Sequence, residues 1–105
     1  MKRSAFLINA ARGPIVDQKA LYHALRDGLI AGAALDVTDP EPMPMDDPLA
    51  ALDNCLIVPH IGSASVATRT RMATLAAENI ATFFHGKRPP TLVNPEVFTQ
   101  HYERK

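Results

Sequence analysis

The chain has 105 residues, with 11 basic and 11 acidic side chains and a formal net charge of 0. Because nucleic acids and anionic membranes attract a basic surplus, this balance argues against either as the main partner. No apolar stretch approaches the roughly 20 residues that span a bilayer, and the single cysteine excludes an internal disulfide and fits a cytoplasmic location.

The first part of the chain predicts a strand, a helix and a second strand. Residues 5–8 form the continuous apolar run AFLI, which is the pattern of a strand covered on both faces. Asp17 is a good N-cap for the helix that follows, and Gly28 predicts the end of that helix. Residues 30–37, IAGAALDV, predict a second buried strand whose small residues permit close packing.

The next part predicts an irregular loop, a third strand and a long helix. Prolines concentrated in residues 40–48 disfavour regular structure, and residues 49–52 can form one helical turn. Residues 55–58, CLIV, predict a third strand whose cysteine fills the core. A helix is expected from an N-cap at Ser65 to Gly86. Its apolar stripe consists of Met72, Leu75, Ala76, Ile80, Phe83 and Phe84.

The order of these elements predicts an α/β layer in which parallel strands are joined by right-handed crossovers. Three strands make a thin sheet, and strands of this apolar type need helices on both faces, of which the sequence supplies few. Residues 87–105 contain three prolines and predict an extended tail. We therefore expect part of a larger fold, with exposed apolar area and association or poor solubility of the isolated chain.

Ionisable residues follow each predicted strand. Arg12 comes after the first strand, Asp36 ends the second and His60 follows the third, while Glu41 lies on the loop beyond Asp36. Because ligands bind beyond the carboxyl ends of parallel strands, these side chains are expected to meet along one rim of the sheet.

Each of these four residues also has a plainer interpretation. Arg12 and Glu41 fit exposed loop charges, Asp36 fits a cap of the following turn, and His60 fits a structural histidine. Their occurrence at successive strand ends favours a site over four independent coincidences.

The chemistry that fits this set is reduction of a carbonyl beside a carboxylate. A guanidinium holds a carboxylate with two parallel hydrogen bonds. A histidine can donate a proton to a ketone oxygen as hydride arrives, and a nearby carboxylate favours the protonated imidazole that this step needs.

Three segments resemble successive signatures of the D-isomer-specific 2-hydroxyacid dehydrogenases. They are INAARG at residues 8–13, ALDVTDPEP at residues 34–42 and VPHIGSAS at residues 58–65. Within that family, DVTDPEPMP, LDNCLIVPHIGSA and TRTRMATLAAENI are most similar to the glyoxylate/hydroxypyruvate reductase branch. The resemblance runs from Phe6 to Val97, and the order and spacing of the motifs agree.

This resemblance implies a role for each matching residue. Arg12 would bind the substrate carboxylate and carbonyl, and His60 would contact the substrate and donate the proton while hydrogen-bonded to Glu41. The other implied residues are Ala10, Asp36 and Gly62 at the cofactor and Ser63 near the substrate. No metal is implied.

The dinucleotide fingerprint Gly-x-Gly-x-x-Gly is absent from the sequence. That turn holds the cofactor pyrophosphate on backbone N–H groups at a helix N-terminus. The glycines stand at positions 13, 28, 32, 62 and 86, so no two are separated by a single residue. The chain therefore resembles the C-terminal third of such an enzyme, and the choice between NAD and NADP stays open because the residues that make it would lie in the absent part.

The implied fold is the C-terminal part of a Rossmann-like, doubly wound parallel sheet of about three strands. Residues 1–86 would form the C-terminal half of an NAD(P)-binding domain, and its long helix would lead to the substrate domain. Residues 87–105 would be an extended tail that belongs to that substrate domain.

Two functions of different classes follow. The first is NAD(P)H-dependent reduction of a 2-oxo acid to a 2-hydroxy acid by a homo-oligomeric enzyme, with the isolated chain inactive. The second is a non-catalytic remnant or interaction module that associates through its uncovered sheet and helix faces. Serine hydrolase chemistry from Ser63, His60 and Asp36 is a weaker alternative because no Gly-x-Ser-x-Gly turn exists.

Overall fold

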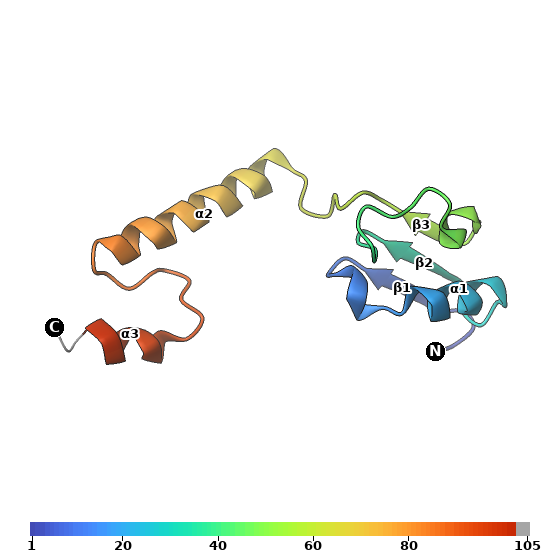
Figure 1. Ribbon diagram of the computed structural model, residues 1–105, viewed down its shortest axis with the longest axis horizontal. Coiled ribbons are helices and arrows are strands. Elements are labelled where there is room, and N and C mark those ends of the chain that lie inside the picture. The colour runs from blue at the N-terminus through green and yellow to red at the C-terminus, as the bar shows by residue number, and fades with distance from the viewer. Residues whose placement is uncertain (103–105) are drawn as a thin grey trace. The chain divides into compact units, whose positions relative to one another are not determined.

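The computed structural model describes residues 1–102, with side chains described to residue 98. It contains two compact units, one formed by residues 1–63 and the other beginning at Ala64. The first unit holds a sheet and one α-helix, and the second holds two helices (Figure 1). The assignment of residues 87–105 to a substrate domain stays a prediction, and residues 103–105 lie outside the described part.

The sheet consists of three parallel strands in the order β1-β2-β3. Strand β1 spans Phe6–Asn9, β2 spans Gly32–Leu35 and β3 spans Cys55–Ile57. The predicted parallel α/β layer is thus confirmed. Strand β2 is shorter than the predicted residues 30–37, although Ile30 and Val37 at its two ends are buried.

Helix α1, Gln18–Arg26, supplies the core on one face of the sheet (Figure 1). As predicted, Asp17 caps it, with its carboxylate accepting a hydrogen bond from the backbone N–H of Ala20 at 3.0 Å. Gly28 follows the helix with φ of +63°, a conformation that favours glycine. The buried apolar cluster consists of Leu21, Leu25, Ile30, Ala33, Leu35 and Leu49.

The opposite face of the sheet is open, which confirms the expectation of exposed apolar area from the few helices, although the apolar run of β1 is typical of a strand covered on both faces. Phe6 is 69% exposed and Ile8 is 75% exposed, and Leu56 on β3 is 63% exposed. Side chains alternate between the two faces of a strand, so these three residues share one face while Leu7 packs against the core. The apolar side chains of β1 are therefore packed on one face of the sheet and exposed on the other.

The proline-rich loop after β2 has no regular structure until a short 3₁₀ helix, η2, Pro48–Ala51, which matches the predicted helical turn. Cys55 on β3 packs against the core cluster, as predicted. Burial raises the pKa of the Cys55 thiol, and the negative charge of Asp47 raises it further by a smaller amount. The thiol is therefore less readily ionised than an exposed cysteine, which fits a packing role.

Gly13 lies against the backbone of the loop that follows β2. A Cβ at this position would lie 2.0 Å from the carbonyl oxygen of Thr38, which is a severe steric overlap. We expect Gly13→Ala to lower the free energy of unfolding by more than about 3 kcal/mol, beyond the usual cost of overpacking, because the backbone itself must move. Gly28→Ala is the matched control, since nothing lies within 4 Å of its added Cβ and only backbone strain of about 1–2 kcal/mol opposes it. Thermal unfolding curves with equal losses for the two variants would contradict this packing argument.

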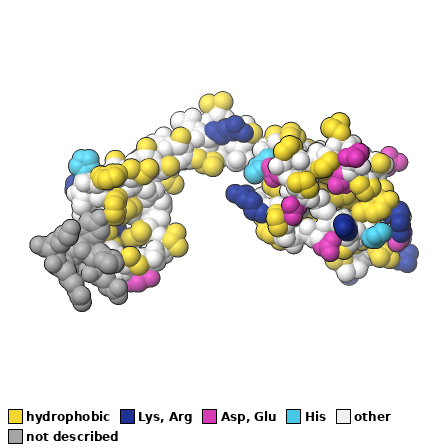
Figure 2. Space-filling view, in the orientation of Figure 1, with side chains coloured by type: hydrophobic (Ala, Val, Ile, Leu, Met, Phe, Trp, Pro, Cys, Tyr) yellow, Lys and Arg dark blue, Asp and Glu magenta, His cyan; other side chains and the backbone are white. Residues whose placement is uncertain are grey.

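The second unit contains α2, Val66–Phe84, and α3, Pro95–Tyr102. Ser65 caps α2 as predicted, since its hydroxyl accepts a hydrogen bond from the backbone N–H of Thr68 at 3.1 Å. No residue of α2 is buried, and hydrophobic side chains reach the surface along it (Figure 2). In the part of the chain that the structure describes, no helix is long and apolar enough to cross a membrane.

The prediction of an extended tail is wrong for residues 95–102, which form α3. Proline disfavours a helix interior but suits the first helical position, where its missing N–H has no intrahelical partner. Asn94 immediately precedes Pro95, and Glu96 places a negative charge in the first turn. These are helix-start signals, so Pro95 begins a helix here instead of preventing one.

Candidate functional site

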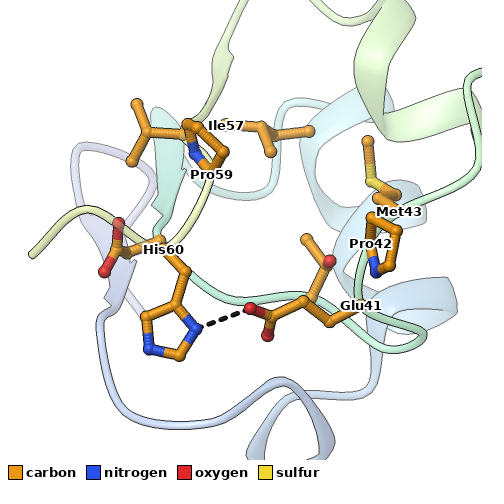
Figure 3. A pocket seen from close by; sticks show the side chains of 9 residues that line it. Glu41, Pro42, Met43, Ile57, Pro59 and His60 are labelled. Carbon is orange, nitrogen blue, oxygen red and sulfur yellow. Dashed lines mark hydrogen bonds and ion pairs between the residues drawn. The ribbon is translucent and has the colours of Figure 1, made fainter.

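A histidine–glutamate pair lies beyond the carboxyl ends of the strands. The Nδ1 atom of His60 lies 2.5 Å from Oε1 of Glu41. Because an ionised carboxylate can only accept, Nδ1–H is the donor. Figure 3 shows the two side chains facing each other, with the other ring nitrogen turned away from Glu41. Nε2 is thereby left available to a ligand. The side chain of His60 is 45% exposed and that of Glu41 is 39% exposed.

The backbone of His60 has an unusual conformation. Its φ is +53°, which makes it the one residue other than glycine with positive φ in the described chain. The pairing of β2 with β3 continues to Val58, whose N–H donates to the carbonyl of Leu35 at 2.9 Å. The chain then turns sharply, and the N–H of His60 donates back to the carbonyl of Val58 at 3.0 Å. Such backbone costs about 1–3 kcal/mol and is concentrated at functional sites.

The carboxylate of Asp36 bonds to the backbone just after His60. Oδ1 accepts from the N–H of Ile61 at 2.6 Å and Oδ2 accepts from the N–H of Gly62 at 2.9 Å. Asp36 therefore does not cap the turn that follows it. It also does not bond to the His60 ring, as the serine hydrolase alternative with Ser63 would require.

The loop that carries Glu41 is held by α1. The side-chain amide of Gln18 donates to the carbonyl of Asp39 at 2.9 Å, and the N–H of Asp39 donates to the amide oxygen of Gln18 at 2.7 Å. Within the loop, the hydroxyl of Thr38 donates to the carbonyl of Pro40 at 2.9 Å. The sequence analysis did not identify Gln18, because its partner is a backbone group 21 residues away.

A hollow of about 550 Å³ adjoins the histidine–glutamate pair. Its walls are mainly apolar, and Figure 3 shows Pro42, Met43, Ile57 and Pro59 around it. A volume in this range is typical of small-molecule sites, in which apolar walls surround a few polar groups.

A second, smaller groove of about 240 Å³ lies at the carboxyl ends of β1, β2 and β3. Ala10, Asp36 and Gly62 line it, so the structure brings together the three residues that the sequence assigns to the cofactor. Asp36 also lines the larger hollow, and the two hollows therefore share this residue.

Arg12 lines neither hollow, and the structure does not bring its side chain to the histidine–glutamate pair. Its guanidinium donates to the neighbouring carbonyl of Ala11 at 2.6 Å. Asn9, which is only 5% exposed, shapes this loop by donating to the carbonyl of Arg12 at 2.9 Å. Ser63 likewise lines neither hollow. The substrate-binding roles of Arg12 and Ser63 stay predictions.

No group of three His, Cys, Asp or Glu residues is placed to hold a metal ion within the described residues. The polar groups of the site are a histidine and two carboxylates at the rim of a parallel sheet. This position, beyond the carboxyl ends of parallel strands, is where doubly wound α/β proteins bind their ligands.

Residues 1–62 match the family model of the D-isomer specific 2-hydroxyacid dehydrogenase, NAD binding domain. The chain belongs to this family, and its sheet is part of the NAD-binding Rossmann domain.

The chain is similar to named reductases over nearly its whole length. It is 58% identical to the glyoxylate reductase of Korarchaeum cryptofilum over 97 residues, which cover 92% of this chain and 29% of that protein. It is 50% identical to the glyoxylate/hydroxypyruvate reductase B of Yersinia pestis over 101 residues, which cover 96% of this chain and 31% of that protein. The chain thus spans about three tenths of the length of these relatives.

A solved structure has a similar fold. The NADPH-dependent glyoxylate/hydroxypyruvate reductase of Sinorhizobium meliloti, in complex with NADP and malonate, superposes with a TM-score of 0.72 at 43% identity. The match covers 78% of this chain and 25% of that one.

Proposed function

We propose that this chain carries the catalytic residues of an NAD(P)H-dependent reductase of short 2-oxo acids such as glyoxylate and hydroxypyruvate. The observation that carries the proposal is the contact between His60 and Glu41 beside an apolar hollow of about 550 Å³. The names and activities of the relatives, at 50–58% identity, point to the same substrates.

The smaller groove suits a nicotinamide ring. Ala10 and Gly62 carry little or no side chain, so a flat ring can lie close to the backbone there. When bound, NAD(P)H would supply the hydride that adds to the carbonyl carbon of the 2-oxo acid. The cofactor pyrophosphate has no glycine fingerprint to bind in this sequence, and we propose that the isolated chain is therefore inactive.

The residues of this chain supply the proton and the electrostatic setting. His60 donates the Nε2 proton to the carbonyl oxygen, which becomes the hydroxyl of the 2-hydroxy acid. Glu41 accepts the Nδ1–H bond, which orients the ring and stabilises its cationic form before transfer. Arg12 is assigned to the substrate carboxylate, for which its guanidinium must leave the Ala11 carbonyl.

A hybrid enzyme tests this proposal directly. In the hybrid reductase, this chain replaces the matching 97 residues of the Korarchaeum cryptofilum glyoxylate reductase. We expect oxidation of NADH or NADPH, followed by absorbance, when glyoxylate or hydroxypyruvate is added. A folded hybrid that binds NADH or NADPH but turns over no 2-oxo acid with either would overturn the proposal.

The open sheet face favours a second candidate function, an interaction module. Phe6 and Leu56 are more than three-fifths exposed on this face, and apolar surface of this kind marks interaction sites. We expect the chain to self-associate and the double variant Phe6→Thr/Leu56→Thr to shift it towards monomer in sedimentation experiments. Ile15→Thr is the control, because Ile15 is equally exposed but lies outside the sheet. Association that the control reduces as much as the double variant would exclude the sheet face.

A further inference from the structure

We infer that Asp36 is a positioning residue that holds His60 in place by binding the backbone that follows it. The inference rests on the proposed function only in taking His60 as the proton donor. It differs from the cofactor role that the family resemblance implies for Asp36, because it concerns an interaction within the protein.

The carboxylate of Asp36 joins two parts of the sheet rim. It accepts from the N–H groups of Ile61 and Gly62 at 2.6 and 2.9 Å. Its own backbone N–H donates to the carbonyl of Asn9 at 2.9 Å, which ties Asp36 to the end of β1. Both oxygens are thus directed at the backbone after His60, and hydrogen bonds to a charged acceptor are stronger than neutral ones.

The backbone at His60 needs such support. Its positive φ is a conformation that residues other than glycine adopt uncommonly and at an energetic cost. Among the described residues, Asp36 supplies the only side chain that hydrogen-bonds to the backbone of residues 59–63. Asp36→Asn replaces one of these two accepting oxygens with an NH2 group that can only donate, so one contact to the backbone after His60 is lost and the other is weakened.

Gly62 is part of the same arrangement. A Cβ at Gly62 would lie 2.8 Å from Oδ2 of Asp36, closer than real Cβ contacts allow. The carboxylate can therefore reach the Gly62 N–H only because this position has no side chain. Gly62→Ala is expected to displace the Asp36 carboxylate without changing its charge.

The test uses NMR spectroscopy of the full chain and its variants Asp36→Asn and Gly62→Ala. In both variants we expect amide hydrogen exchange at Ile61 and Gly62 to accelerate by about tenfold to a hundredfold. We also expect the HN–Hα coupling of His60 to leave the value of the left-handed region, and the nuclear Overhauser contacts between the His60 ring and Glu41 to disappear. Asp27→Asn is the matched control, because Asp27 pairs with Arg26 on the surface.

Two results would overturn the inference. One is faster exchange at Ile61 and Gly62 with an unchanged His60 coupling and intact His60–Glu41 contacts, which would make Asp36 a structural residue only. The other is loss of those contacts to the same extent in the Asp27 control. If Asp36→Asn fails to fold, Gly62→Ala decides the question. These measurements need no turnover, so an inactive hybrid reductase would count against the proposed function and leave this inference standing.

Discussion

Replacing His60 with asparagine in the hybrid reductase is expected to lower kcat with glyoxylate by about 10²- to 10⁴-fold, the contribution typical of a positioned general acid. Asparagine keeps much of the volume of the ring but has no group that releases a proton near neutral pH. The KM for NADPH should change little, because His60 does not line the smaller groove assigned to the cofactor.

His23→Asn is the matched control for this experiment. His23 lies on α1, exposed and in edge contact with the Tyr22 ring, and it lines neither hollow of the site. Its replacement should leave kcat within about twofold, as expected for a surface change worth no more than roughly 0.5 kcal/mol. If His60→Asn retained more than a tenth of the activity, proton donation by His60 would be disproved.

Most of the helices and strands could be predicted because helix caps and apolar runs depend only on residues close together in the sequence. Asp17 and Ser65 were predicted to cap helices, and both do so through their own side-chain oxygens. The prediction of an extended tail was wrong for an equally local reason. Pro95 was interpreted as a helix breaker, but it is the first residue of α3. The exposed face of β1 followed from the small number of helices in the whole sequence, because the apolar run of the strand alone does not say whether a covering layer is present.

The strand ends predicted the positions of Asp36 and His60 at the sheet rim, but not the geometry of the contacts there. A sequence pattern can place Glu41 and His60 at one rim of a parallel sheet. It cannot show the positive φ of His60 or the bond from the Gln18 amide to the backbone of Asp39, since both depend on contacts between distant segments. It also cannot show that the side chain of Arg12 turns towards its own loop.

Replacing Glu41 with glutamine separates the charge of the glutamate from its shape. The glutamine oxygen can still accept from Nδ1–H of His60, so the ring keeps a partner, but the negative charge that favours its cationic form is lost. We expect kcat of the hybrid reductase to fall by about 10- to 100-fold, which corresponds to replacing a charge-assisted hydrogen bond by a neutral one. Glu41→Ala should cost more, because it also removes the orientation of the ring.

The control for Glu41→Gln is Asp46→Asn, which neutralises another exposed acid on the same loop. A general effect of loop charge on substrate binding would lower the activity of both variants alike and would raise the KM for glyoxylate. Stabilisation of the imidazolium predicts instead that only the Glu41 variant loses activity and that the loss lies in kcat. Equal losses in the two variants would show that the Glu41 carboxylate acts through the overall charge of the loop and not through the 2.5 Å contact with His60.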